Sequence, residues 1–220
     1  MSYIIVLEGL DAAGKNTQSK RLVEKLDSIG RSAVLFSFPR YETEVGKAIK
    51  RLLTGELLVA EQGHEHDPVR RAPEDPLILQ ALNLIDKYDA VHDMDTAVEH
   101  GSIVVCDRWT PSALCFGDAD GLDSVWLQRV QNYLPMGDLN LFIDVPQEEA
   151  LRRRPQMRDR FERDREKQNV IRANYETLWA AAAEDEENGW GWVKIDGVGT
   201  EDEVAGRIWT RVMDLLGLEP

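Results

Sequence analysis

The segment with the clearest chemical signature runs from Gly9 to Thr17 and reads Gly-Leu-Asp-Ala-Ala-Gly-Lys-Asn-Thr. It matches the pattern G-x-x-x-x-G-K and lies between a short apolar run and a segment of helical period. The glycines let the backbone curl so that successive N–H groups and a helix N-terminus face one anion, while the lysine reaches the β- and γ-phosphates of a nucleoside triphosphate. The residues expected to contact the phosphates are Gly9, Ala12, Ala13, Gly14, Lys15, Asn16 and Thr17.

The position after the lysine departs from the usual pattern. Asn16 stands where Ser or Thr normally supplies a hydroxyl ligand to Mg²⁺. An amide oxygen of Asn16, the hydroxyl of Thr17 or a water molecule are the candidate replacements, because Mg²⁺ keeps waters in its octahedral shell. The simpler alternative for the whole segment is a glycine turn that joins a strand to a helix. Such a turn would not need a lysine directly after its second glycine.

A carboxylate and a guanidinium follow the apolar run from Ile103 to Cys106. Asp107 and Arg108 come directly after this predicted strand, at the sheet edge where ligands bind in open α/β folds. Burying such a charge without a partner or an ion costs several kcal/mol. Asp107 therefore needs either a charged partner or a bound ion, and in the second case it is a candidate metal ligand together with Asn16.

Arginine is concentrated in residues 152–165, which hold seven arginines in fourteen positions. Guanidinium groups stabilise the charge that spreads over the oxygens of a transferred phosphoryl group. The alternative is a solvated helix face with i,i+4 ion pairs, for which Asp159, Glu162 and Asp164 are available. The functional interpretation predicts a mobile arginine-rich lid that closes over the nucleotide.

The elements that position these residues follow from an alternation of short apolar runs with longer segments of helical period. Such alternation predicts βαβ units and a parallel sheet covered on both faces. Together with the glycine-rich motif after the first strand, it leads us to expect an α/β fold of the P-loop NTPase type, three layers α/β/α with a five-stranded parallel sheet. The predicted strands are Tyr3–Leu7, Ala33–Phe38, Ile103–Cys106, Leu139–Val145 and Trp192–Ile195. A final helix is expected from Glu201 to Leu216, with an apolar stripe that faces the sheet.

Size and composition indicate a single domain over residues 1–220, since 43% of the residues are hydrophobic and 30% charged. The polar stretch 55–76 has three prolines and no periodicity, and we interpret it as a flap. The net charge of 26 − 40 = −14 argues against nucleic acid as a partner, because phosphate contacts need basic side chains. Because no stretch approaches the roughly 18–20 apolar residues of a membrane span, we expect a cytoplasmic protein without a membrane partner.

Four segments resemble, in the same order, the thymidylate kinases, which are P-loop nucleoside monophosphate kinases. They are Gly9–Gln18 (GLDAAGKNTQ), Phe38–Tyr41 (FPRY), Asp107–Phe116 (DRWTPSALCF) and Asp159–Asp164 (DRFERD). The resemblance reaches from residue 9 to residue 164. It implies transfer of the γ-phosphate of ATP to dTMP, giving dTDP, with Mg²⁺ as cofactor and a homodimer as the assembly.

The resemblance also implies roles for individual residues. Arg40 and Arg108 are expected to hold the acceptor phosphate, because a rigid, planar guanidinium group can donate two hydrogen bonds to one phosphate. Other expected substrate contacts are Asp11, Phe38, Tyr41, Ser112, Phe116 and Glu162, with Phe116 under the sugar, where simple core packing is its alternative. Because Ala12 and Ala13 replace the P-loop arginine of some members, the lid is expected to supply arginines instead. The implied catalytic set is Asp11, Lys15, Arg108, Arg154, Arg158 and Arg160.

The sequence departs from the family at the expected base pocket. Members usually carry an aromatic residue, then three residues, then Arg, and Asn83 and Lys87 occupy these two positions here. A lost base–aromatic stack removes about 1–3 kcal/mol of binding. Either a ring such as Tyr88 compensates, or the pocket accepts a more polar pyrimidine nucleotide such as dUMP or 5-hydroxymethyl-dUMP. dTMP remains the expected acceptor because the other motifs agree.

Two further functions stay open from the sequence. One is a P-loop switch or motor ATPase, although a guanine-specificity element Asn-Lys-x-Asp is absent from the sequence and Arg40 and Arg108 would have no task. The other is a catalytically weakened nucleotide-binding protein, which Asn16 and Asn83 motivate. An acceptor-dependent release of ADP separates a kinase from both.

Overall fold

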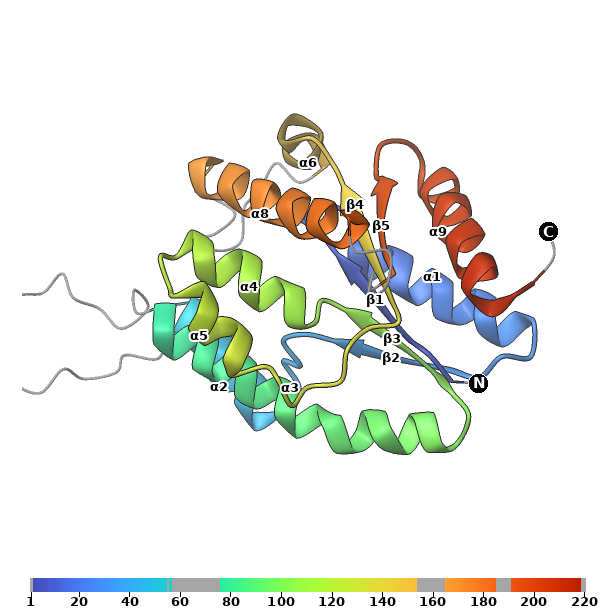
Figure 1. Ribbon diagram of the computed structural model, residues 1–220, viewed down its shortest axis with the longest axis horizontal. Helices are drawn as coiled ribbons and strands as arrows, with labels where there is room; N and C mark the ends of the chain where they lie inside the picture. Colours follow the sequence, from blue (N-terminus) through green and yellow to red (C-terminus); the bar gives the residue numbers. More distant parts are fainter. Residues whose placement is uncertain (1, 55, 57–75, 154–164, 185–190, 219–220) are drawn as a thin grey trace, which may run out of the picture.

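The structure is a computed structural model that describes residues 2–54, 56, 76–153, 165–184 and 191–218. Its centre is a five-stranded parallel sheet in the order β2-β3-β1-β4-β5 (Figure 1). The strands are β1 (Ile4–Glu8), β2 (Ala33–Ser37), β3 (Ile103–Asp107), β4 (Leu139–Asp144) and β5 (Trp192–Asp196). The predicted fold class is confirmed, and each predicted strand agrees with the observed one to within a residue at either end.

The register of the sheet brings the two chemically important strand ends together. β1 lies between β3 and β4, with Leu7 paired both to Asp107 of β3 and to Leu141 of β4. Because all these strands are parallel, their carboxyl ends share one edge of the sheet. The glycine-rich loop after β1 therefore begins next to Asp107 and Arg108.

One face of the sheet is covered by α1 (Lys15–Ser28) and α9 (Glu201–Leu216) (Figure 1). The predicted final helix is confirmed, including its bounds. It begins with a capping box, in which the side chains of Thr200 and Glu203 each bond the other's backbone N–H group. Its buried apolar residues, Val204, Ile208 and Val212, join a core cluster with the alternate side chains of β1, β3 and β4.

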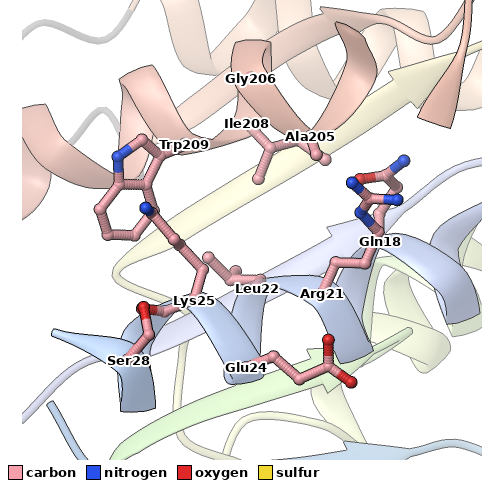
Figure 2. A pocket seen from close by; sticks show the side chains of 10 residues that line it. All are labelled: Gln18, Arg21, Leu22, Glu24, Lys25, Ser28, Ala205, Gly206, Ile208 and Trp209. Atoms are coloured by element: carbon pink, nitrogen blue, oxygen red, sulfur yellow. The ribbon is translucent and has the colours of Figure 1, made fainter. Parts of the chain in front are cut away.

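An open groove lies between these two helices, as Figure 2 shows. The α9 side of the groove has little bulk at Ala205 and Gly206, and a Cβ atom added at Gly206 would meet no atom within 4 Å. Across the groove, Nζ of Lys25 lies 5.4 Å from the ring centroid of Trp209. None of the predicted phosphate-binding residues lines this groove.

The other face is covered by α3 (Pro76–Glu99) and α8 (Arg165–Glu184). α4 (Thr110–Ala119) packs on both of them, and α2 (Glu44–Leu53) packs on α3. α5 (Ser124–Arg129) and α6 (Gln147–Arg153) complete the described helices. Pro76, the last residue of the predicted flap, belongs to α3, because proline fits the first turn of a helix; residues 57–75 lie outside the described part.

The lengths and compositions of the described helices also bear on membrane insertion. In the part of the chain that the structure describes, no helix has the length and apolar character to cross a bilayer.

Candidate active site

The glycine-rich loop is shaped by glycines at positions that other residues do not tolerate. Gly9 has a φ of 142°, and a Cβ atom there would lie 2.6 Å from the carbonyl oxygen of Ile143 on β4. Gly14, with a φ of 94°, is the N-cap of α1. The loop therefore passes close to the sheet and turns directly into a helix N-terminus, where backbone N–H groups and the helix dipole favour an anion.

Lys15 is buried at the start of α1, inside this loop. Its Nζ donates hydrogen bonds to the carbonyl oxygens of Gly9 at 3.1 Å and Leu10 at 2.6 Å. Burial and, after it, the nearby charge of Arg108 lower the pKa of Lys15 to about 8, against the opposing effect of the carboxylates of Asp11 and Asp107. An anion bound in the loop would stabilise the charged lysine, as the predicted phosphate contact requires.

Arg108 joins the loop to the end of β3. Its guanidinium donates to the carbonyl oxygen of Gly9 at 3.0 Å, to Oδ1 of Asp11 at 2.5 Å and to Oγ of Ser112 at 3.2 Å. Its φ is 69°, a left-handed conformation that non-glycine residues rarely adopt. Burial alone would lower the pKa of Arg108, but the surrounding carboxylates, Asp11 first, raise it. The side chain is thus a permanent cation held in a fixed orientation.

The residues predicted to bind Mg²⁺ fit a hard cation in part. Asp107 is buried at the carboxyl end of β3, and its carboxylate forms no hydrogen bond or ion pair with the described residues. Asn16 is exposed and Thr17 half-buried on the first turn of α1. The described residues contain no cluster of three or more His, Cys, Asp or Glu side chains suited to a metal. One carboxylate suits Mg²⁺ that is otherwise coordinated by phosphates and water.

Arg40 lies just past β2, only 7% exposed, and is bonded to α3. Its Nε donates to Oδ1 of Asp86 at 3.0 Å, and its Nη2 donates to Oδ2 of Asp89 at 2.6 Å. Burial would lower the pKa of Arg40, but the hydrogen bond to Asp89 and the charge of Asp86 raise it. The guanidinium is therefore oriented by two carboxylates of one helix.

The turn that carries Arg40 is held against the start of α2. Oγ1 of Thr43 donates to the carbonyl oxygen of Arg40 at 2.9 Å and accepts from the backbone N–H of Gly46 at 3.0 Å. A Cβ atom at Gly46 would lie 1.8 Å from that same carbonyl oxygen. Because Gly46 has no side chain, the turn that carries Arg40 can pack directly against the first turn of α2.

The structure brings most of the predicted acceptor residues around one cavity. The predicted residues that line it are Asp11, Phe38, Tyr41, Asn83, Lys87, Arg108, Ser112 and Phe116. The others are Pro39, Leu53, Leu79, Gln80 and Ala113. The Cζ atom of Arg108 lies 4.8 Å from the ring centroid of Phe116 at this cavity. Arg40 does not line the cavity, because its guanidinium is directed to α3.

One wall of the cavity is a polar face of α3. Lys87, 3% exposed, and Gln80, 5% exposed, form no side-chain hydrogen bond or ion pair within the described part of the chain. Asn83, between them, donates from Nδ2 to the carbonyl oxygen of Leu79 at 2.9 Å. Burial lowers the pKa of Lys87 to about 8, opposed by the charges of Glu8 and Asp86. These polar side chains are placed to meet a polar ligand.

Three residues in or next to this site were not indicated by the sequence, namely Gln80 at the cavity, Asp86, which bonds Arg40, and Glu8, which bonds Trp109 and Ser112. Gln80 precedes Asn83 and Lys87 by three and seven residues, so the helical period could have placed it on their face. Asp86, next to Lys87, carried no motif. Glu8 ends an apolar strand, as Asp107 does. An acidic residue at the end of such a strand is the sequence feature that could have identified Glu8.

The arginine-rich segment is described only at its ends. Arg152 and Arg153 belong to α6 and pair with Glu149 at 2.8 and 2.9 Å, as the ion-pair alternative predicts for a helix face. The predicted catalytic arginines Arg154, Arg158 and Arg160, together with Glu162, lie outside the described residues. The greater part of the predicted lid, 152–165, lies there too.

The chain matches the family model described as thymidylate kinase over residues 7–195. It is 33% identical over 176 residues to the "Probable thymidylate kinase" of Pyrococcus horikoshii, covering 79% of this chain and 80% of that protein. It is 27% identical to the thymidylate kinase of Schizosaccharomyces pombe, covering 93% of this chain and 89% of that protein.

A solved structure shares the fold. The thymidylate kinase of Candida albicans superposes with a TM-score of 0.78 at 20% identity, covering 98% of this chain and 92% of that one. The glycine-rich loop, the half-buried Arg108 and the cavity beside them lie within the segment that the family model matches. The chain therefore belongs to the thymidylate kinase family of ATP-using nucleotide kinases.

Proposed function

We propose that the protein transfers the γ-phosphate of ATP to dTMP and releases dTDP and ADP. The observation that carries this proposal is the position of Arg108, whose guanidinium contacts both Gly9 and Asp11 of the phosphate-binding loop. A cation of the acceptor cavity thus lies against the loop that binds the donor. An acceptor phosphate beside Arg108 would meet the γ-phosphate of a nucleotide bound on the loop, as in-line transfer requires.

On the donor side, the loop and the N-terminus of α1 bind the phosphates of ATP through backbone N–H groups. Lys15 exchanges its carbonyl partners on Gly9 and Leu10 for phosphate oxygens. Mg²⁺, held through Asp107 with Asn16 or Thr17 nearby, would neutralise charge on the transferred phosphoryl group. The lid arginines Arg154, Arg158 and Arg160 stay a prediction, as does the sugar contact of Glu162.

On the acceptor side, Arg108 and Ser112 hold the phosphate of dTMP, and Tyr41 lines the same cavity. Arg40 stays a predicted phosphate contact, because its guanidinium is directed to α3 and does not line the cavity. Phe38 and Phe116 supply aromatic walls, and Asp11 lies near the sugar. The phosphate oxygen of dTMP itself attacks the γ-phosphorus, so no protein nucleophile takes part. Catalysis rests on positioning and on charge stabilisation by the fixed cations.

The base of the acceptor would lie against the polar face of α3. Lys87 is a donor suited to a carbonyl oxygen at position 4 of thymine or uracil, and it would repel the amino group of cytosine. Gln80 and Asn83 add amide groups where the family has an aromatic ring. This polar wall favours dUMP and 5-hydroxymethyl-dUMP as the second candidate acceptors.

A steady-state assay of ADP release with Mg²⁺-ATP tests the proposal. We expect release that depends on dTMP, and a comparison of dTMP, dUMP, 5-hydroxymethyl-dUMP and dCMP as acceptors ranks the base preference. Lys15→Ala is the control that removes transfer while the fold remains. Release of ADP that ignores every monophosphate would support a P-loop switch instead.

Assembly and location complete the proposal. We infer a homodimer and a cytoplasmic location, both from the family resemblance and from the need for ATP and dTMP. Light scattering after size-exclusion chromatography measures the assembly directly. A monomer at micromolar concentration with full activity would contradict the homodimer.

A further inference from the structure

Glu8 is a fully buried carboxylate with no place among the substrate contacts proposed above. It ends β1 and directly precedes Gly9 of the phosphate-binding loop. A carboxylate in such a position requires hydrogen-bond donors, because an unpaired buried charge is strongly unfavourable. Its donors come from two other elements, α4 and α8.

The first oxygen of Glu8 caps α4. Trp109 is the N-cap residue of this helix, and its side chain makes no capping hydrogen bond. Instead, Oε1 of Glu8 accepts from the backbone N–H of Trp109 at 2.8 Å and, more weakly, from that of Ser112 at 3.3 Å. A negative charge at this end also interacts favourably with the helix dipole. Glu8 thereby fixes the turn that carries Arg108.

The second oxygen of Glu8 sets the direction of a hydroxyl proton. Oε2 accepts from Oγ of Ser112 at 2.7 Å and from the hydroxyl of Tyr175 at 2.7 Å. Burial, with the charge of Glu8 next, raises the pKa of Tyr175 well above its ordinary value, so this hydroxyl remains a donor. Oγ of Ser112 also lies 3.0 Å from the hydroxyl of Tyr175, a contact in which either hydroxyl could donate. The shorter hydrogen bond, to Glu8, engages the single hydroxyl proton of Ser112, because a carboxylate oxygen can only accept.

A lone pair of Ser112 is consequently left for Arg108. Nη1 of Arg108 donates to this Oγ at 3.2 Å. The hydrogen bonds form one directed chain, from Arg108 to Ser112 to Glu8, and Tyr175 enters the chain from α8 at the same carboxylate oxygen. Tyr175 is itself held by Phe142 of β4, whose ring centroid lies 5.2 Å away in a stacked arrangement.

We propose that Glu8 is a positioning residue of the acceptor phosphate site, which orients Arg108 through Ser112 and is itself oriented by Tyr175. This inference rests on the proposed function, since it takes Arg108 as the group that holds the phosphate of dTMP. Glu8 touches no substrate in this scheme. Its effect should therefore appear in acceptor binding and not in ATP binding.

The variant Glu8→Gln tests the direction of the chain. If its NH₂ group faces Ser112 and Tyr175, both hydroxyls must turn their protons away, and Ser112 then presents a proton toward Arg108. If the amide is flipped, the NH₂ group faces the backbone donors of α4 instead. We expect the KM for dTMP to rise about tenfold, the effect of one hydrogen bond to a charged group, with the KM for ATP within about twofold of wild type.

Tyr175→Phe and the double variant measure the coupling. Tyr175→Phe removes one donor and leaves Ser112 in place, so we expect a rise in the KM for dTMP of about threefold. Because both changes act on the same oxygen, the double variant should be no worse than Glu8→Gln alone. Independent effects that multiply would overturn the shared chain.

The matched control is Glu44→Gln, at an exposed carboxylate whose ion-pair partner among the described residues is Lys47. It should have wild-type constants. A Glu8→Gln enzyme whose two KM values rise equally, or whose melting temperature falls with both KM values unchanged, would show that Glu8 only supports the fold. If Glu8→Gln does not fold, Ser112→Ala breaks the same chain, and an unchanged KM for dTMP in that variant would overturn the inference.

Turnover of the wild-type protein distinguishes a failure of the proposed kinase function from a failure of the proposed role of Glu8. Absence of dTMP-dependent turnover in the wild type contradicts the proposed function itself. Normal wild-type turnover with an unaffected acceptor KM in the variants contradicts the role of Glu8 alone.

Discussion

Arg40 and Asp86 are joined by three hydrogen bonds although 46 residues separate them in the chain. The backbone N–H and Nε of Arg40 donate to the carboxylate of Asp86 at 2.9 and 3.0 Å, and Nη2 donates to the carbonyl oxygen of Asp86 at 2.8 Å. Asp86 is fully buried. The guanidinium is thus oriented by the protein before any acceptor phosphate binds, which lowers the entropy lost on binding.

Replacement of Asp86 by asparagine should weaken acceptor binding and stability together. The amide keeps the size of the side chain but removes the charge that holds Arg40, and breaking a buried ion pair costs about 3–5 kcal/mol. We expect a lower melting temperature and a KM for dTMP raised by at least about tenfold, with the KM for ATP unchanged. Steady-state kinetics with each substrate varied in turn measures both constants.

Asp89 supplies the control, because it bonds the same guanidinium with a side chain that is 60% exposed. Exposed pairs contribute about 0–1 kcal/mol, so Asp89→Asn should change the KM for dTMP by less than about fivefold. Equal effects of the two variants would mean that burial of Asp86 does not set the orientation of Arg40.

The pH dependence of the free enzyme should show the buried lysine of the phosphate-binding loop. Burial lowers the pKa of Lys15 to about 8, so the lysine loses its proton as the pH rises through that value. The ratio kcat/KM for ATP reports the free enzyme and should fall about tenfold per pH unit above pH 8. At saturating ATP the bound phosphates stabilise the charged lysine, and kcat should stay constant to a higher pH.

The outcome that opposes this prediction is a kcat/KM for ATP that stays level to pH 10. The control is the pH profile of kcat/KM for dTMP. That profile depends on Lys87, whose pKa is also lowered to about 8. In a Lys87→Met enzyme the fall of kcat/KM for ATP above pH 8 should remain, because that fall comes from Lys15.

Lys87→Met should make the protein more stable and a poorer kinase. The folded-state pKa of Lys87, about 8, lies below its ordinary value of 10.5, so the buried charge destabilises the fold wherever both states are protonated. At pH 7 we expect a gain of about 3 kcal/mol in the free energy of unfolding, which disappears as the pH rises from 8 to 10.5. Chemical denaturation at pH 7 and pH 10 measures the difference.

The same variant should raise the KM for dTMP about tenfold, because the donor to the base carbonyl is lost. Preference for dTMP over dCMP should fall in parallel. A Lys87→Met protein with unchanged acceptor kinetics would place the base elsewhere than against α3.

Phe116→Ala should relax the choice between deoxyribose and ribose. The ring lines the acceptor cavity beside Arg108, and its removal makes room for a 2′-hydroxyl. We expect the ratio of kcat/KM for dTMP to that for the ribonucleotide counterpart to fall about tenfold, within the range that a pocket contact supplies. Competition assays with both nucleotides measure this ratio.

Tyr133, 87% exposed, provides the control, and Tyr133→Ala should keep the selectivity of the wild type. If Phe116→Ala lowers the melting temperature and leaves the sugar preference intact, the ring serves in core packing. It packs against two buried clusters, one of Ile49, Leu52 and Leu79 and the other of Leu10, Cys115, Phe142, Ile171 and Tyr175.

The fold was predictable because its signals are local. Each strand is a short run of apolar residues between polar segments, and the final helix carries its own capping residues and apolar stripe. The glycine-rich loop could be located for the same reason, since Gly9, Gly14 and Lys15 lie within seven residues of one another. Its binding of phosphate stays a prediction. Neighbouring strands then brought Arg108 to the loop.

The rest of the site depends on pairs far apart in the chain. Asp86 finds Arg40, and Glu8 finds Ser112 and Tyr175 across separations of 104 and 167 residues. A lone acidic residue in a helix or at a strand end has no local pattern that names its partner. Gln80 was missed for a different reason, because a glutamine on an amphipathic helix is usually a surface residue.

Two kinds of recognition share α3. Asp86 and Asp89 orient Arg40, the predicted phosphate contact, and Gln80, Asn83 and Lys87 line the cavity where the base would lie. A redesign that tilts or slides this helix would therefore disturb both ends of the nucleotide at once. Substitutions at positions 80, 83 and 87 that leave the backbone of α3 in place could change the preferred pyrimidine base without disturbing Arg40.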